Sequence, residues 1–148
     1  MTRRILTTLA AAGLASVGTL AAIPADAASA IQFRTIYVNS PGTDTRSNSS
    51  LNAEYATLKN TSTTTKTLTG VTVRDTSGHV YKFGTFKLAG GASVKLHTGK
   101  GTNTAAHRYW GSGNYIWNNS GDKAILKSSG GTTLDTCSWA TVSSTTAC

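Results

Sequence analysis

The sequence predicts an all-β protein with a β-sandwich fold, and three observations support that fold class. First, short alternating segments are separated by turn residues about every 8–12 positions, as in known sandwiches. Second, the 148 residues include 26 Thr, 16 Ser and 15 Gly, which are poor helix formers. Third, charged residues make up only 14%, so the Lys/Glu pairs of exposed helices are missing. A hydrophobic share of 39% with 11 aromatic residues still allows a core, which argues against disorder.

The chain starts with a predicted signal peptide over residues 1–27. Two arginines near the start are followed by residues 5–23, which carry no charge and are rich in Ala and Leu. This stretch is almost long enough to span a membrane, but the small-x-small pattern after it favours cleavage between Ala27 and Ala28. A second such pattern three residues later is an alternative cut. The two arginines do not distinguish general from twin-arginine export.

Residues 28–148 are therefore expected to form a single secreted domain, extracellular or associated with the cell wall. We expect no membrane span after cleavage, because no other uncharged stretch is long enough. This part of the chain carries 12 Lys and Arg against 5 Asp and Glu, a net charge of +7. We expect it to be monomeric in dilute solution.

The first strands of this domain follow from residue type and alternation. Residues 31–38 are rich in β-branched and aromatic side chains and end at the turn cluster of residues 39–42. A polar segment over residues 44–52 is predicted to be a loop. Residues 55–59 alternate between apolar and polar side chains, so they are predicted to form a half-buried strand.

The middle of the chain repeats this pattern. Residues 61–67 are rich in Thr and are predicted to be a solvent-facing turn, after which residues 68–73 resume the alternation. Residues 75–78 predict a tight hairpin turn into a strand at residues 80–83. Another half-buried strand is predicted at residues 94–97.

The last part contains the longest irregular stretch, residues 98–114, which holds four glycines. Residues 118–122 predict a turn ahead of an apolar strand at residues 124–126. A glycine turn at residues 129–131 leads into the final strand segments up to residue 139. The whole pattern predicts eight or nine short strands.

Several segments together resemble the lamin tail domain, in the version carried by small secreted bacterial proteins. The most specific is residues 117–126, which read Trp-Asn-Asn-Ser-Gly-Asp-Lys-Ala-Ile-Leu. The others, in order, are residues 54–60, 68–75, 81–83, 88–91 and 131–135. One departure is Val71, where the family often has Trp. The resemblance covers residues 31–139 and implies an immunoglobulin-like sandwich without enzymatic activity, a fold used to bind proteins and, in lamins, chromatin.

The physical interpretation of residues 117–126 is structural as well. Its Asn, Gly and Asp residues tolerate left-handed backbone and favour a turn between strands. Trp117, Ala124 and Leu126 are expected to point inward. Asp122 is interpreted as a turn residue, with a ligand-binding role as the alternative.

No catalytic, metal or cofactor site is predicted. His79, His97 and His107 are the only histidines, and no His or Cys pair has the spacing of metal ligands. His79 is expected to be a surface side chain beside a turn. The chain lacks a nucleophile elbow and a phosphate-binding loop. The predicted function is a non-catalytic binding or structural module, with a small secreted hydrolase or enzyme inhibitor of unrecognised site as the alternative.

Basic residues and aromatic residues gather in the second half of the chain. They define a candidate binding surface of Lys100, Arg108, Tyr109, Trp110, Tyr115 and Lys123, with Lys95 and Lys127 nearby. Such a mixture suits phosphates, single strands or sugars. The alternative is that Trp110 and Tyr115 close an open end of the sandwich. The predicted partner is an anionic polymer or protein at the cell envelope, and nucleic acid would bind without specificity.

The two cysteines of the chain, Cys137 and Cys148, are predicted to form a disulfide because the protein is exported and no third thiol competes. Closing the segment between them contributes about 3 kcal/mol by the chain-entropy model. The bridge would hold the C-terminal tail against the strand that carries Trp139.

Overall fold

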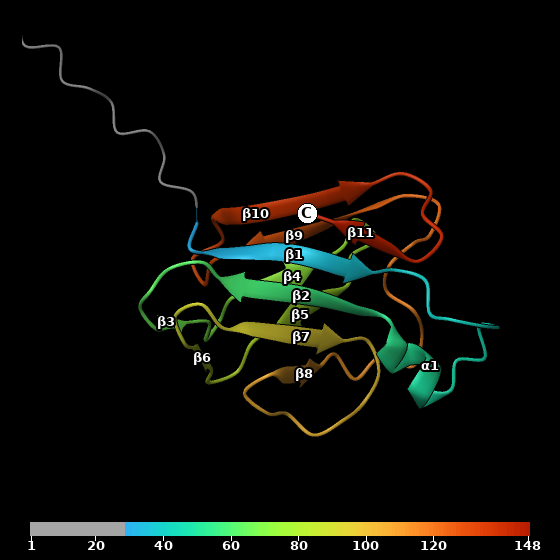
Figure 1. The fold of residues 1–148 in the computed structure, drawn as a ribbon, viewed down its shortest axis with the longest axis horizontal. Helices are drawn as coiled ribbons and strands as arrows, with labels where there is room; N and C mark the ends of the chain where they lie inside the picture. Colours follow the sequence, from blue (N-terminus) through green and yellow to red (C-terminus); the bar gives the residue numbers. More distant parts are fainter. Residues whose placement is uncertain (1–28) are drawn as a thin grey trace, which may run out of the picture.

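A computed structural model describes residues 29–148 as two facing β-sheets (Figure 1). The predicted signal peptide, residues 1–27, and the cleavage site between Ala27 and Ala28 lie outside the described residues. The elements in chain order are β1 (Ile31–Tyr37), α1 (Asn48–Ala53), β2 (Tyr55–Asn60), β3 (Lys66–Thr67), β4 (Thr72–Arg74), β5 (Val80–Lys82), β6 (Lys87–Leu88), β7 (Ser93–His97), β8 (His107–Tyr109), β9 (Asp122–Lys127), β10 (Thr133–Trp139) and β11 (Thr145–Ala147).

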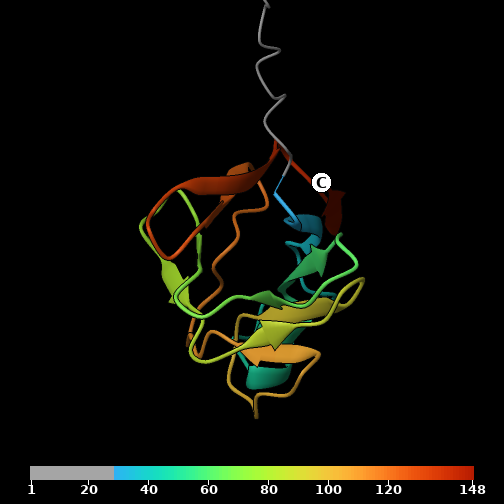
Figure 2. The ribbon, with the colours of Figure 1, turned by 90° about the vertical axis from the view of Figure 1, so that its left-hand side faces the viewer.

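One layer is a five-stranded sheet in the order β11-β1-β2-β7-β8, and the other is a four-stranded sheet in the order β10-β9-β4-β5. A small two-stranded sheet, β3-β6, lies at one end of the molecule. Figure 2, which looks along the strands, shows the two layers on either side of the core. All strand pairs are antiparallel except β7 with β8. The predicted all-β sandwich is confirmed.

The core lies between the inner faces of the two sheets, where the alternation of each strand places its apolar side chains. Ala56 and Leu58 of β2 and Ala124 and Leu126 of β9 are completely buried. Val71 is also buried, so the smaller side chain at this position still belongs to the core.

Three tryptophans fill one part of the core. Trp117 is buried and makes T-shaped contacts with Trp110 and Trp139, each with ring centroids 5.9 Å apart. The indole N–H of Trp139 donates to the carbonyl oxygen of Asn118 at 2.8 Å, which satisfies its polar group. The inward orientation predicted for Trp117, Ala124 and Leu126 is thus observed.

The loop predicted over residues 44–52 is wrong in its second half, because residues Asn48–Ala53 form the helix α1. The side chain of Ser47 caps this helix by accepting a hydrogen bond from the backbone N–H of Ser50 at 3.3 Å. Leu51 is its buried residue. One helical turn needs only such a cap and one apolar anchor, so composition does not exclude it.

Other element predictions also need correction. Residues 66–67, predicted as part of a turn, form β3 by pairing with β6, and residues 29–148 contain eleven strands where eight or nine were expected. The strand predicted over residues 68–73 begins only at Thr72, because Gly70 adopts a φ of +81° and the N–H of Val71 bonds back to Leu68 O at 2.9 Å. The predicted irregular stretch 98–114 contains β8, which pairs in parallel with β7. A strand this short forms because its neighbour in space supplies the hydrogen bonds.

Cys137 and Cys148 form a disulfide with a Cα–Cα distance of 5.3 Å. Cys137 lies on β10, an edge strand of the four-stranded sheet, while Cys148 follows β11, an edge strand of the five-stranded sheet. The bond therefore joins the two layers along one side of the sandwich. It also holds the C-terminal tail, which pairs with β1 through residues Thr145–Ala147.

We expect the double variant Cys137→Ser/Cys148→Ser to lose about 2–3 kcal/mol of unfolding free energy, because the denatured chain is no longer constrained. The tail should exchange its amide protons faster than β1 does, since only three residue pairs then hold it. Hydrogen exchange and urea denaturation measure the two effects. Two alkylatable thiols in the native protein would contradict the disulfide.

Candidate functional site

The carboxylates of the described chain are largely turned inward. Asp122 accepts hydrogen bonds from the backbone N–H groups of Asn118 at 3.1 Å and Lys123 at 2.8 Å, and from the Thr76 hydroxyl at 2.8 Å. Asp135 accepts from the backbone N–H of Phe33 on the other sheet at 2.8 Å. These contacts organise turns and strand ends, which supports the interpretation of Asp122 as a turn residue.

Glu54 is the most deeply buried of these carboxylates, with no exposed surface. One carboxylate oxygen, Oε1, accepts from the Thr98 hydroxyl at 2.6 Å and from the backbone N–H of Ile116 at 2.8 Å. Burial raises the pKa of Glu54 to about 7, although these hydrogen bonds oppose the shift. Because the side chain has no surface, it acts within the fold and does not contact a solute.

Asp75 is buried and pairs with His79, whose Nδ1 lies 2.5 Å from Asp75 Oδ2. This is the only ion pair found in the part of the chain that the structure describes. Half of the His79 side chain remains exposed, as predicted for a surface residue beside a turn. The Lys and Arg side chains of residues 29–148 thus have no carboxylate partner within ion-pair distance.

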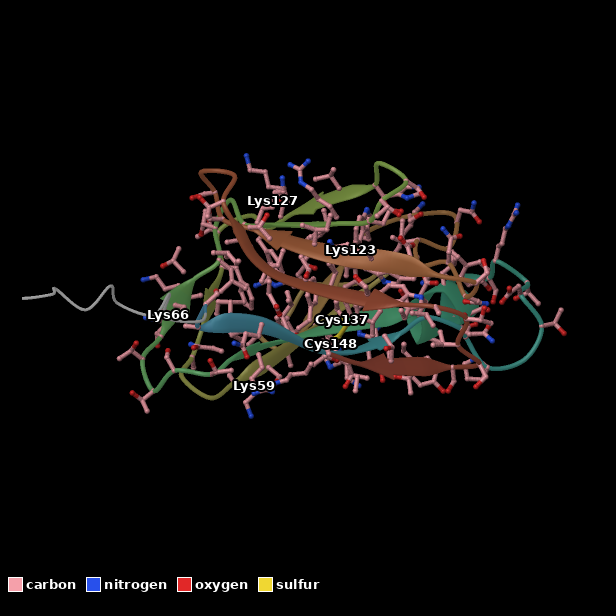
Figure 3. All side chains as sticks on the ribbon, turned by 90° about the horizontal axis from the view of Figure 1, so that it is seen from above. Lys59, Lys66, Lys123, Lys127, Cys137 and Cys148 are labelled. Carbon is pink, nitrogen blue, oxygen red and sulfur yellow. A yellow bond between two sulfur atoms is a disulfide. The ribbon has the colours of Figure 1, made fainter. Side chains whose placement is uncertain are left out.

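Four of these cations lie on the outer face of the four-stranded sheet, which we call the basic face: Arg74, Lys82, Lys123 and Lys127. Their orientation follows from alternation, because Val73, Ala124 and Leu126 on the same strands are buried inside. Figure 3 shows Lys127 projecting on the opposite side of the sandwich from Lys59.

The strand register spaces these cations over the face. Thr72 of β4 is opposite both Lys127 of β9 and Lys82 of β5, so the two lysines flank one threonine about 10 Å apart. Lys123 is four residues from Lys127 on the same strand, a separation of about 13 Å. Arg74 donates from Nε to the Thr72 hydroxyl at 3.2 Å, which orients its guanidinium.

The other outward positions of this sheet carry no carboxylate. On β10 they are Thr136 and Ser138, both exposed; on β5 the exposed Val80 lies beside Lys82, and on β9 Ile125 lies between Lys123 and Lys127. The surface therefore combines positive charge with hydroxyl groups, an arrangement that can bind an anionic, hydroxyl-bearing chain.

The outer face of the five-stranded sheet carries a row of rings. Tyr37, Tyr55, His97 and Tyr109 are opposite one another on β1, β2, β7 and β8. Successive ring centroids are 5.5, 5.5 and 5.0 Å apart. We call this surface the tyrosine face, formed by Tyr37, Tyr55, Lys59, Lys95, His97, His107 and Tyr109.

The tyrosine face contains a histidine pair that the sequence did not reveal. His97 Nε2 lies 2.9 Å from His107 Nδ1, although the two residues are ten positions apart in the chain. His97 Nδ1 donates to the carbonyl oxygen of Asn52 at 2.7 Å, since a carbonyl only accepts. Burial lowers the pKa of His97, and the charges of His107 and Lys95 act in the same direction. No cluster of three or more metal-ligating side chains occurs among residues 29–148.

The six residues of the predicted binding surface do not share one face. Tyr109 lies on the tyrosine face and Lys123 on the basic face, which belong to different sheets. Lys100 is exposed in the loop after β7, where its backbone N–H donates to Asn48 Oδ1 at 2.7 Å.

The remaining three occupy structural positions. The Arg108 guanidinium lies 3.8 Å from the centre of the Phe86 ring, next to the core. Trp110 is half-buried and packs against Trp117. The Tyr115 hydroxyl makes a 2.6 Å hydrogen bond with a serine of α1. The alternative interpretation, in which Trp110 and Tyr115 close part of the sandwich, agrees with these contacts.

Two facing sheets of mainly antiparallel strands that enclose one hydrophobic core define the class of this protein as an immunoglobulin-like β-sandwich. A family model described as Lamin Tail Domain matches residues 24–141, and the chain belongs to this family. Lamin tail domains are generally non-catalytic modules. No curated protein matches the chain.

Within residues 29–148, no helix has the length and apolar character needed to cross a bilayer.

Proposed function

We propose that the mature chain, residues 28–148, is a secreted non-catalytic module that binds an anionic polymer of the cell envelope through the basic face. The observation that carries this proposal is the separation of charges in the fold. Arg74, Lys82, Lys123 and Lys127 share one outer face, while the neighbouring carboxylates of Asp122 and Asp135 accept hydrogen bonds inside the protein. A surface of this kind attracts polyanions and has no internal partner to compete with them.

Secretion is supported by two features. The N-terminal residues have the pattern of a cleaved signal peptide. The disulfide between Cys137 and Cys148 is the kind of bond that persists in oxidising compartments. A secreted protein meets envelope polymers before it meets nucleic acid.

The chemistry of the basic face favours phosphate groups. Three of its four cations are lysines, and the fourth, Arg74, is partly engaged with Thr72. Lysine is a common phosphate-binding residue and acts as a point charge, so several separate lysines suit a chain of repeated phosphate groups. Thr136 and Ser138 add hydroxyl groups that suit a hydroxylated backbone. We therefore take a polyol-phosphate polymer as the proposed ligand.

The test compares two variants of equal net charge. Lys123→Glu/Lys127→Glu changes the basic face, and Lys66→Glu/Lys87→Glu changes the small β3-β6 sheet. Binding to poly(glycerol phosphate) and to isolated cell wall is measured at low and high salt. We expect the first variant to bind at least about tenfold more weakly at low salt and the second to remain close to the wild type.

Both variants should keep the wild-type melting temperature, because these outward lysines have no ion-pair partner among the described residues and such surface charges contribute little to folding. Wild-type binding should weaken steeply as salt rises. Equal losses in the two variants would show a response to net charge alone and would overturn the assignment to the basic face. Absence of binding at low salt would overturn the proposed function.

A further inference from the structure

The tyrosine face, like the basic face, carries positive charge without a carboxylate among its outward positions. Lys59 and Lys95 alternate with the buried residues Leu58 and Leu96, which places their side chains outside the five-stranded sheet. Lys95 Nζ lies 4.3 Å from the centre of the Tyr55 ring, so a cation and an aromatic ring form one surface there.

The rings of this face are arranged so that most of their flat sides are covered. Tyr37 and Tyr55 are stacked with an interplanar angle of 26°, and His97 and Tyr109 with an angle of 18°. Gly101 lies so close to the Tyr109 ring that an added Cβ would be 2.4 Å from it. The row therefore presents mainly ring edges and hydroxyl groups and offers few free ring faces for stacking with nucleic-acid bases.

This arrangement favours the same kind of ligand as the basic face. Ammonium groups, phenol hydroxyls and the hydroxyls of Thr57 and Ser93 surround the row on the outer surface. The stacked rings hold one another in place, so little side-chain freedom is lost when a polymer binds. A hydroxylated, phosphate-bearing chain fits this surface better than a single-stranded nucleic acid.

The two faces lie on opposite sides of the sandwich, as the positions of Lys59 and Lys127 show in Figure 3. The two sheet planes are roughly 10 Å apart, and the side chains of each face project outward from them. The distance between the two faces is therefore larger than about 10 Å. Along one side the layers are joined by the Cys137–Cys148 disulfide, and along the other Arg108 covers Phe86. A short polymer segment on one face therefore does not reach the other.

We propose that the tyrosine face is a second binding surface for the polyol-phosphate polymer, so that one module bridges two polymer chains. This inference rests on the proposed function, because it assumes that the basic face binds the same polymer. Its consequence is that the protein cross-links its ligand. Binding at the basic face alone would coat the polymer without joining one chain to another.

The test measures binding and cross-linking separately. A poly(glycerol phosphate) fragment no longer than one face gives the stoichiometry by calorimetry, and the long polymer gives cross-linking by light scattering. We expect two fragments per wild-type protein and strong scattering with the long polymer. The variants Lys59→Glu/Lys95→Glu and Lys123→Glu/Lys127→Glu should each bind one fragment and reduce the scattering at least about tenfold. The single remaining face of Lys123→Glu/Lys127→Glu no longer allows attachment at two sites, which accounts for its weaker binding to the long polymer.

The control variant Lys66→Glu/Lys87→Glu has the same net charge and should scatter like the wild type. One fragment per wild-type protein, or wild-type scattering from Lys59→Glu/Lys95→Glu, would overturn bridging and leave binding at the basic face intact. Loss of all binding in Lys59→Glu/Lys95→Glu, with full binding in Lys123→Glu/Lys127→Glu, would overturn the proposed function instead. Cross-linking of duplex DNA but not of poly(glycerol phosphate) would overturn the assignment of the polymer.

Discussion

The variant Trp117→Ala is expected to lose about 4 kcal/mol of unfolding free energy, which is a large part of the stability of a domain of this size. Trp117 is only 3% exposed and contacts both Trp110 and Trp139 edge to face. Its removal leaves a cavity between the two sheets and breaks both aromatic contacts. Urea denaturation followed by far-UV circular dichroism measures the loss.

The control for this prediction is Trp117→Phe, which keeps most of the apolar volume and should cost clearly less than the alanine variant. Binding to poly(glycerol phosphate) by folded Trp117→Phe should equal that of the wild type, because Trp117 lies in neither face. A loss below about 1 kcal/mol in Trp117→Ala would contradict the central role of the three tryptophans.

Stability should fall by about 3 kcal/mol as the pH rises from about 4.5 to 8, because of Glu54. Burial raises the pKa of this carboxyl to about 7 in the folded protein, so it keeps its proton after the unfolded chain has lost one at about 4.5. The folded state then binds more protons between these values. Its extra stability is fully present at the acidic end and is lost as the pH rises through about 7.

The variant Glu54→Gln isolates this effect. Its amide oxygen can accept the hydrogen bonds from Thr98 and Ile116, and it carries no charge at any pH. We expect it to match the wild type near pH 5 and to be more stable at pH 8. Asp44→Asn removes an exposed charge that contributes least to the raised pKa of Glu54, so it should keep most of the pH dependence.

His97 has the opposite effect on the pH dependence of stability, and it does so at lower pH. Its lowered pKa means that the unfolded chain binds a proton that the folded protein excludes, so this group favours folding as the pH rises towards 6.5. Comparison of Glu54→Gln with the wild type at each pH removes the His97 contribution, because both proteins share it. Parallel pH profiles for the two proteins would contradict the prediction for Glu54.

Much of the fold could be predicted from the sequence, because alternation, turn residues and the family motif are patterns of neighbouring residues. The alternation of β2 and β7, and the hairpin turn before β5, predicted strands that the structure contains. The motif over residues 117–126 identified the lamin tail domain, and the match over residues 24–141 confirms that family. The even cysteine count, in a chain predicted to be exported, predicted the disulfide that the structure shows.

The candidate binding surface was harder to predict from the sequence. The sequence shows only which charged residues are close along the chain, and not which are close in space. Lys123 and Lys127 could have been placed on one face, since residues four apart in a strand point the same way. Their neighbours Arg74 and Lys82 come from about 40 residues earlier and join them only through the pairing of β4 with β9 and β5. Strand order decides such neighbours, and a single sequence carries no direct signal for it.

The sequence by itself determined the β-sandwich class, the family, the net charge and the residues that fill the core, because each depends on composition or on the two-residue period of a strand. The tertiary structure alone decided which charges lie together. Parallel pairing of β8 with β7 brings His107 next to His97. Packing of the two sheets buries Glu54 and Asp122, while the lysines point outward. These contacts join residues far apart in the chain, so they exist only once the two sheets have formed and packed.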